Sequence, residues 1–544
     1  MPTSRGATSL WLSSTSTHPL RFRLFGTSIP QLRLTMEQTG EKIYSSWSQK
    51  DLIARILELE GKKDKIKIIH PKNSKRKFDP SLYSTRHIAL RIAYLGGNYT
   101  GFEYHPNSPN PTDTIEEQIF RALLKARLVP SNGVEGEEET VLGWPGDEVA
   151  EYSKCGRTDT GVSAFGQVIG VRVRSNRPRP KKPADEVAEE DDEGERERAE
   201  FDDEKDELPY LQILNRLLPK DIRALAWCPH PPPAFSARFN CQQRHYRYFF
   251  TNPAIAPSPN STVGSLDIDK MREAARLYIG DHDFRNFCKL DASKQITRFD
   301  RIIHHADIVE LRQSSPSNSP KVYYFELHGS AFLWHQVRHM VAILFLIAQG
   351  LEPPSLVTEM LDISKNPRKP MYEMADDRAL VLWDCVFPDG MLQWLYPRGT
   401  RLEGRNEVLD DVWSRWHKSK IDEILTSGLM KIVSANGDPA SNSGLQCTPA
   451  MLGSGEFSIT TQEMGVAKRK AKGKSQILVL GGPEPLFRGT YIPILERKRM
   501  EDIEVLNARY VEKKGDWQEN RKKRQAKRKA ADISEEIMQT SVSL

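Results

Sequence analysis

Residues 154–164 (KCGRTDTGVSA) have the composition of a rigid loop that presents one carboxylate, that of Asp159. Gly156 and Gly161 bracket the aspartate, and glycine allows a positive φ or the close approach of a ligand. Arg157 adds a planar guanidinium that suits a phosphate or a carboxylate. An ordinary surface turn is the alternative, because Gly, Asp and Thr are common turn residues. A phosphate-binding P-loop is excluded, since no Lys-Ser or Lys-Thr pair follows the second glycine.

A second group of candidate site residues lies in residues 235–250 (FSARFNCQQRHYRYFF). Side chains alternate along a strand, so Arg244, Tyr246 and Tyr248 fall on one face of the strand predicted there. An arginine beside two aromatic rings is what a stacked base and its phosphate need. Aromatic residues on a strand usually form ordinary core, and spacing alone slightly favours that interpretation. The alternating arginines favour binding, because a purely apolar core does not tolerate them.

A third group, residues 331–340 (AFLWHQVRHM), leads into an apolar helix. His335 and His339 are four residues apart, a spacing that can place two metal ligands on one helix face. No glutamate follows the first histidine and no third ligand is apparent, so we expect satisfied polar side chains and no metal site. Arg338 must find a buried anion at the start of the apolar helix or lie at the surface.

The elements that must position these groups follow from hydrophobic periodicity. A half-buried strand is predicted at 86–96, and a second strand at 168–174 directly follows the Asp159 loop. Thr114 opens a helix through a capping box with Glu117. Further predicted elements are helices at 210–218, 268–279, 340–350 and 406–425, and strands at 301–310 and 322–328.

Composition restricts the class of protein. The 544 residues can bury a large core and suggest more than one domain. The net charge is +5, but residues 185–207 hold 15 acidic and 3 basic residues, a net of −12 that leaves +17 elsewhere and suits a polyanionic partner. The six cysteines are far apart and form no CxxC pair, which argues for a reducing compartment and against structural zinc. The longest apolar run, 340–348, is too short to span a bilayer, so no membrane association is predicted.

The strings GRTDTGVSA, FSAR with RHYRY, and AFLWHQVRHM resemble, in this order, the active-site motifs of the TruA-type tRNA pseudouridine synthases over residues 86–390. The stretches SAFGQV, DFRNFC and MVAILFLIAQG are similar to the eukaryotic branch that modifies tRNA positions 38 and 39 in the anticodon stem-loop. The resemblance implies a tRNA-uridine isomerase. A catalytically inactive tRNA- or RNA-binding protein of the same fold is the alternative, and the joint presence of Asp159, Tyr246 and Arg338 counts against it.

The resemblance also implies roles for single residues. Asp159 would be the catalytic aspartate, which either attacks C1′ of the ribose or removes the 2′ proton. Arg338 would pair with Asp159 and hold it ionised, because a nearby opposite charge lowers the pKa of an acid. Tyr246 would pack on the target base, and Arg157 would help to hold the displaced nucleotide. Arg244 is expected at the same substrate-binding surface. No metal or other cofactor is implied.

The fold implied is α/β (α+β), with two similar subdomains whose antiparallel sheets, flanked by helices, meet at a central basic cleft that holds the active site. We expect a leader, short helix and basic linker at 1–85, an N-terminal synthase subdomain at 86–230 with a disordered acidic insertion at about 176–208, a C-terminal subdomain at 231–390, and a C-terminal extension at 391–544. Synthases of the family are homodimers in which one tRNA contacts both subunits, so a homodimer is expected here.

Two terminal segments bear on localisation. Residues 521–529 (RKKRQAKRK) contain seven basic residues, as a nuclear address or a loose RNA-binding arm would. Residues 1–35 contain no Asp or Glu and many Ser, Thr and Arg, which is typical of mitochondrial presequences and also of plain leaders. We expect the protein in the nucleus and the cytoplasm, with mitochondrial targeting as the weaker alternative.

Overall fold

The computed structural model describes residues 83–105, 113–132, 143–177, 201–255, 264–311, 320–397, 407–437, 476–488, 490–515, 517 and 523–525. All of them belong to one compact unit, Pro80–Leu544. The predicted leader, first helix and basic linker lie outside the described residues, as do 178–200 of the acidic segment and most of the basic run at 521–529. Among the described residues, no helix has both the length and the apolarity to cross a bilayer.

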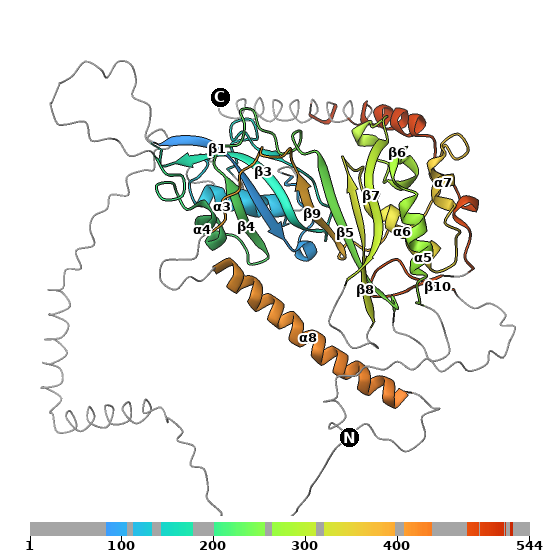
Figure 1. Cartoon of the computed structure of the whole chain (residues 1–544). Helices are drawn as coiled ribbons and strands as arrows, with labels where there is room; N and C mark the ends of the chain where they lie inside the picture. Colours follow the sequence, from blue (N-terminus) through green and yellow to red (C-terminus); the bar gives the residue numbers. More distant parts are fainter. Residues whose placement is uncertain are drawn as a thin grey trace, which may run out of the picture. The chain divides into compact units, whose positions relative to one another are not determined.

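One nine-stranded sheet forms the centre of the described fold, in the order β4-β1-β3-β9-β5-β8-β7-β6, with the short β2 paired to β3 (Figure 1). Its strands are β1 (Ser84–Tyr94), β2 (Ser153–Lys154), β3 (Ser163–Ser175), β4 (Ile222–Cys228), β5 (Gln243–Asn252), β6 (Gly280–Asp283), β7 (Asp300–Glu310), β8 (Lys321–Gly329) and β9 (Leu380–Val386). All neighbours are antiparallel except β3 and β9, which pair in parallel at Ser163–Val381 and Ala164–Leu382. The predicted antiparallel sheets are thus two halves of one sheet.

Helices pack on both halves of the sheet (Figure 1). The N-terminal half carries α3 (Ile115–Lys125) and α4 (Tyr210–Leu217), and the C-terminal half carries α5 (Ile268–Arg276), α6 (Gln336–Ala348) and α7 (Leu356–Leu361). Single turns of 3₁₀-helix lie at η2 (Gly96–Asn98), η4 (Arg285–Phe287), η5 (Ala292–Lys294) and η8 (Ile494–Glu496). The predicted α/β fold, a mostly antiparallel sheet flanked by helices, is confirmed.

The local sequence explains where two of these helices lie. The side chain of Thr114 accepts a hydrogen bond from the backbone N–H of Glu117, as the predicted capping box requires, and α3 begins there. Every residue of α6 is buried, including Arg338 and His339, because the helix is apolar on all sides and lies in the core. This core helix begins within the third candidate group, at Gln336, so its first turn fixes those side chains.

The end of the acidic segment is part of the fold, although the sequence indicated a disordered insertion to about residue 208. Arg86 of β1 forms buried ion pairs with Asp203 and Glu207, the latter at 2.9 Å. Glu207 also accepts a hydrogen bond from the hydroxyl of Ser175. A count of charges could not show that these carboxylates have a buried guanidinium to compensate them.

The described residues beyond 390 divide into two parts. Helix α8 (Glu407–Gly437) is longer than the predicted helix at 406–425, and most of its side chains are exposed. By contrast, strands β10 (Gln476–Leu478) and β11 (Leu486–Arg488) and the residues that follow them return to the C-terminal half. There Glu352 accepts hydrogen bonds from the hydroxyl of Tyr491 and the backbone N–H of Ile494, which is fully buried.

Candidate active site

The loop that carries Asp159 is fixed by its backbone. The N–H of Phe102 donates to the carbonyl of Thr158 at 3.0 Å, and the N–H of Gly161 donates to the carbonyl of Tyr99 at 3.2 Å. Gly161 has a φ of 78°, and a Cβ atom there would lie 2.5 Å from a carboxylate oxygen of Asp377. The glycine is therefore required both for its conformation and for the close approach of the facing segment.

The carboxylate of Asp159 faces the residues that precede α6. Its Oδ1 accepts a hydrogen bond from the indole Nε1 of Trp334 at 3.2 Å, and Nε2 of His335 lies 3.5 Å away. The side chain is only 23% exposed. Burial raises its pKa to about 6, although the charge of Arg338 and the hydrogen bond from Trp334 act in the opposite direction. At pH 7 the group is mostly ionised, yet it is much more basic than an ordinary aspartate.

The structure, which describes both residues, shows no ion pair between Arg338 and Asp159, although the sequence predicted one. Its Nε donates to the carbonyl of Ala375 at 2.8 Å, and its Nη2 lies 3.5 Å from Oδ2 of Asp377. The charge of Arg338 still lowers the pKa of Asp159 from this position, but burial outweighs it, so the net shift is upward. The effect of Arg338 on this pKa thus has the predicted sign, but burial, which the sequence did not indicate, decides the net shift.

Tyr246 lies near enough to Asp159 for the charge of the carboxylate to affect its phenol. It is on β5, it is 9% exposed, and its ring meets that of Phe332 edge-on at 5.1 Å. Burial raises the pKa of its phenol well above the ordinary range, and the charge of Asp159 adds to this shift. The structure thus brings together Asp159 from the loop, Tyr246 from β5 and Trp334 from the start of α6.

The two other predicted arginines differ in their surroundings. Arg244 donates to the backbone carbonyls of Cys241, Ser330, Cys155 and Arg238 at 2.7 to 3.1 Å, which uses both of its terminal nitrogens to hold chain segments together. These bonds favour a structural role over the predicted contact with substrate. Arg157 is half exposed, its Nη2 lies 3.0 Å from Glu103, and it remains accessible to a ligand.

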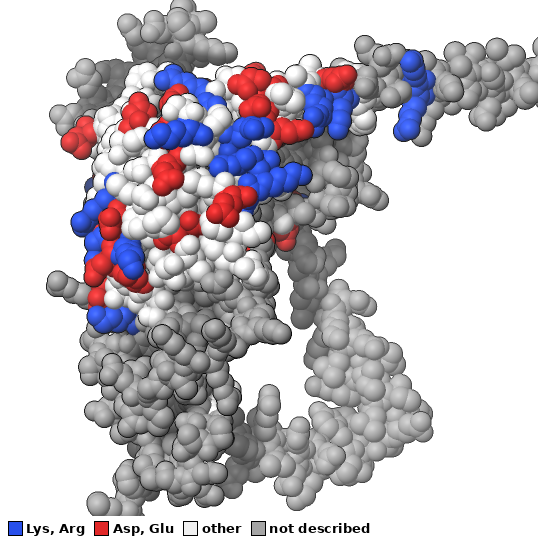
Figure 2. All heavy atoms as spheres, turned by 90° about the vertical axis from the view of Figure 1, so that its right-hand side faces the viewer, with Lys and Arg blue, Asp and Glu red and all other residues white. Residues whose placement is uncertain are grey.

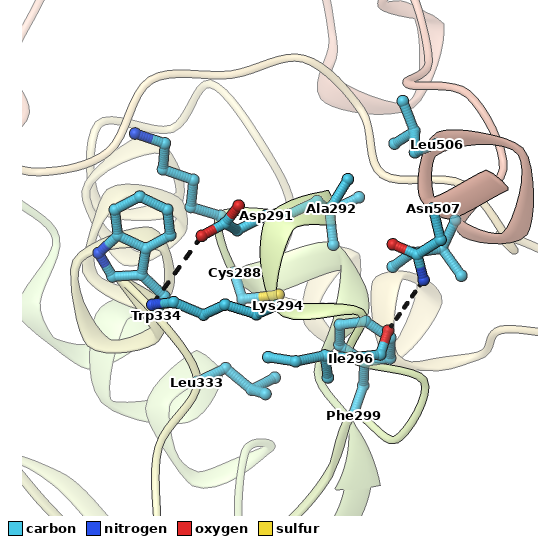
Figure 3. A pocket seen from close by; sticks show the side chains of 13 residues that line it. Cys288, Asp291, Ala292, Lys294, Ile296, Phe299, Leu333, Trp334, Leu506 and Asn507 are labelled. Carbon is cyan, nitrogen blue, oxygen red and sulfur yellow. Dashed lines mark hydrogen bonds and ion pairs between the residues drawn. The ribbon is translucent and has the colours of Figure 1, made fainter. Parts of the chain in front are cut away.

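Two lysines that the sequence did not indicate flank Trp334. The ammonium groups of Lys289 and Lys294 lie 4.3 and 4.8 Å from the centre of its ring. Figure 3 shows Lys294 extending along the indole in a pocket that also holds Asp291 and Asn507. The two lysines belong to no recognisable sequence motif. A tryptophan next to an apolar stretch is normally interpreted as a core residue. Only the fold shows that all three belong to the surroundings of Asp159.

The predicted pair of histidines is not arranged to bind a metal. Nδ1 of His339 donates to the carbonyl of His335, and its Nε2 lies 2.8 Å from Nζ of Lys369, so both ring nitrogens have partners. His335 has a φ of 58°, and its Nδ1 is buried without a hydrogen-bond partner among the described residues. Burial and then the charge of Arg338 lower its pKa to about 4, so it is neutral at pH 7.

One group of possible metal ligands does exist, at three cysteines that the sequence separates widely. Among the described residues, the sulfur atoms of Cys155, Cys241 and Cys385 lie within 4.8 Å of one another, and all three residues are buried. The first is four positions before Asp159 and the second is five positions before Tyr246. The absence of a CxxC pair therefore did not exclude a cysteine cluster.

Comparison with known proteins places these features in a family. Residues 274–388 match the model of the tRNA pseudouridine synthase family. The tRNA pseudouridine(38/39) synthase of Saccharomyces cerevisiae is 37% identical over 494 residues, which cover 87% of this chain and 93% of the yeast protein. The human protein of the same name is 36% identical over 473 residues, 83% of this chain and 85% of its own. The tRNA pseudouridine synthase A of the archaeon Methanothrix thermoacetophila is 31% identical over 316 residues, 58% of this chain and 87% of its own.

Proposed function

Because this chain belongs to the tRNA pseudouridine synthase family, we propose that it converts uridine to pseudouridine at positions 38 and 39, in the anticodon stem-loop of tRNA. The structural observation that supports catalysis is the setting of Asp159, a mostly buried carboxylate on a backbone-fixed loop. A carboxylate repels phosphate, so contact with the RNA backbone does not explain this side chain. A carboxylate that does chemistry on a ribose must be held in this way.

The reaction breaks the C1′–N1 bond, turns the detached uracil and joins its C5 to C1′. Asp159 in its ionised form either attacks C1′ or removes the 2′ proton. The indole N–H of Trp334 fixes the orientation of the carboxylate, and Tyr246 provides an aromatic surface for the detached base. The uridine must first be turned out of the stem-loop, which costs a few kcal/mol and is offset by stacking and phosphate contacts.

Cations at the mouth of the site supply the contacts to phosphate. Lys289, Lys294 and Arg157 are close to Asp159 or its loop, and each is at least partly exposed. Figure 2 shows one side of the molecule, on which Lys and Arg alternate with Asp and Glu rather than forming a continuous basic surface. We therefore expect local cations to position the target nucleotide, and more distant ones to add affinity that salt weakens.

The test is single-turnover formation of pseudouridine on an anticodon stem-loop transcript by Asp159→Asn, beside a binding isotherm at fixed salt. The substitution keeps the size of the side chain and removes its charge, so turnover should be lost while binding remains. Asp147→Asn is the matched control, because Asp147 also accepts from an indole N–H, that of Trp144, outside the site. Turnover by Asp159→Asn near the parental rate would refute the mechanism. Binding without turnover in the parental protein would support the inactive alternative.

We further propose that the chain forms a homodimer, as the resemblance implies. Tyr248 and Phe250 of β5 pack on Phe345 of α6, so Phe249 points to the opposite face of the sheet. There it contacts Tyr324 and Trp383, and all three rings are only partly buried. Sedimentation equilibrium should give twice the mass of the chain. A monomer at micromolar concentration would contradict this proposal.

Localisation to the nucleus and the cytoplasm is also a proposal, which rests on the basic run at 521–529. Deletion of this run from a tagged protein should reduce nuclear accumulation and leave turnover of purified tRNA largely unchanged, because no site residue lies there. An unchanged distribution would remove the nuclear-address interpretation. A loss of salt-dependent RNA affinity would instead assign the run to phosphate binding. Mitochondrial signal from the tagged protein would support the weaker alternative for residues 1–35.

A further inference from the structure

Three thiols from distant parts of the chain meet behind the catalytic loop. Cys155 lies at the start of the Asp159 loop, Cys241 precedes β5, and Cys385 is on β9. They are 3%, 7% and 7% exposed, and their sulfur atoms all lie within 4.8 Å of one another. The reaction of uridine uses none of them. Three polarizable groups that converge in the core are therefore left without a function.

The geometry fits a shared ion. Thiolates that bind one zinc ion at about 2.3 Å lie roughly 4 Å from each other, so the three sulfur atoms need only small adjustments to bind one ion. Soft thiolate ligands select Zn²⁺ or Cu⁺ over hard cations such as Mg²⁺ and Ca²⁺. The sheet fixes two of the three backbone positions: the N–H of Cys155 donates to the carbonyl of Val168 on β3, and Cys385 pairs with Arg244 on β5.

One guanidinium, that of Arg244, lies beside the three cysteines. Both terminal nitrogens of Arg244 donate to backbone carbonyls of the cluster, those of Cys241 and Cys155. Three thiolates, one divalent ion and one guanidinium together carry no net charge, which a buried site requires. A monovalent ion would leave one negative charge uncompensated.

We propose that Cys155, Cys241 and Cys385 form a metal site for a soft d¹⁰ cation, Zn²⁺ being the ion that the charge balance favours. The ion connects the base of the Asp159 loop to β5 and β9, and it releases thiol protons as it binds. Its role is structural, because it holds the loop against the strand that carries Tyr246. The prediction that the chain has no metal site rested on sequence spacing, and the fold removes that argument.

The first test measures metal in the full-length protein purified without chelator. Elemental analysis should find about one zinc, or one copper, per chain. Cys241→Ser should lose this metal, and Cys228→Ser should keep it, since Cys228 is an equally buried cysteine outside the cluster. Metal content that is the same in both variants would overturn the proposal.

The second test does not depend on what the protein acquires during expression. Chelator-treated parental protein, shown to be folded by circular dichroism, is titrated with Co²⁺ and, separately and anaerobically, with Cu⁺. Saturation at one equivalent, with thiolate-to-metal charge-transfer absorption that Cys385→Ser lacks and Cys228→Ser retains, supports the site and shows which ion binds more tightly. A folded parental protein that gives no such absorption with either ion has only three packed thiols.

Discussion

At the scale of single residues, the protonation state of Asp159 depends on two opposing effects, its burial and the groups that stabilise its charge. Burial raises its pKa to about 6, while Arg338 and the indole N–H of Trp334 stabilise the ionised form. The carboxylate is thus ionised at pH 7 but remains a better base or nucleophile than an exposed aspartate. Because the reaction needs the ionised form, the rate should fall as the pH is lowered through about 6.

Trp334→Phe tests this competition. The variant keeps an aromatic ring and removes the only donor that Trp334 offers to Asp159, so the pKa of Asp159 should rise by about one unit. The low-pH limb of the single-turnover rate profile should move to higher pH by that amount, whereas the plateau rate at high pH reports the separate loss of carboxylate orientation. Trp144→Phe, which removes an indole bond to Asp147, should leave the profile in place. A profile that does not move in Trp334→Phe would show that this hydrogen bond does not set the pKa.

The ordered motifs located Asp159 and Tyr246, but sequence could not supply their neighbours. Arg338 was expected to pair with Asp159, whereas it contacts Ala375 and Asp377. These two residues come from a segment without a motif, and their proximity depends on how that segment returns across α6. A contact between residues that are distant in the chain depends on the fold. A sequence motif contains only one of the two residues and does not identify its partner.

For helix α6, whose N-cap residue is His335, one chain of buried polar contacts serves both the stability of the fold and the geometry of the site. His335 contacts Asp159, its carbonyl accepts from His339, and His339 lies against Lys369, which also donates to the carbonyl of Cys288 at 2.6 Å. Lys369 is 6% exposed, and burial lowers its pKa to about 8. A lysine in such a place is tolerated only because its donors have partners.

Lys369→Met should therefore destabilise the protein. The side chain keeps its approximate length, but the ring nitrogen of His339 and the carbonyl of Cys288 lose their donor, at about 1–3 kcal/mol for each buried unsatisfied group. Urea unfolding at pH 7 measures the loss. Lys365→Met is the control, because the side chain of Lys365 is 76% exposed and its ion pair with Asp362 is a surface pair. Equal stability of the two variants would contradict a structural role for the buried chain.

Periodicity predicted most elements near the site and missed one that is essential to it. The strands predicted at 301–310 and 322–328 are β7 and β8, and the helix predicted at 210–218 is α4. Strand β9 was missed because it lies in the centre of the sheet and its first residues are buried on both faces. Its sequence is therefore a short apolar run without the alternation that identifies a half-buried strand. That strand joins the two halves.

For the whole molecule, the C-terminal segment belongs to the catalytic fold. Val479 and Ile494 are 1% and 0% exposed, and Asn507 bonds to the carbonyl of Ile296 beside the Lys294 loop. Ending the chain after residue 475 should lower the unfolding free energy by several kcal/mol, since each fully buried apolar side chain contributes about 1.5–3 kcal/mol. Ending it after residue 517 keeps these contacts and should leave the thermal midpoint unchanged within a few degrees. Similar midpoints for the two truncations would refute this assignment.

The parallel pairing of β3 with β9 has a consequence for how the protein is made. Asp159 and Trp334 are 175 residues apart in the chain, and the strand that aligns their segments ends at Val386. At a synthesis rate of about 5–20 residues per second, roughly 9–35 seconds separate the emergence of the aspartate from that of its indole partner. During this interval the edge of β3 lacks its central neighbour. The nascent N-terminal half is then inactive and exposes the edge of β3. This edge needs protection from pairing with strands of other chains.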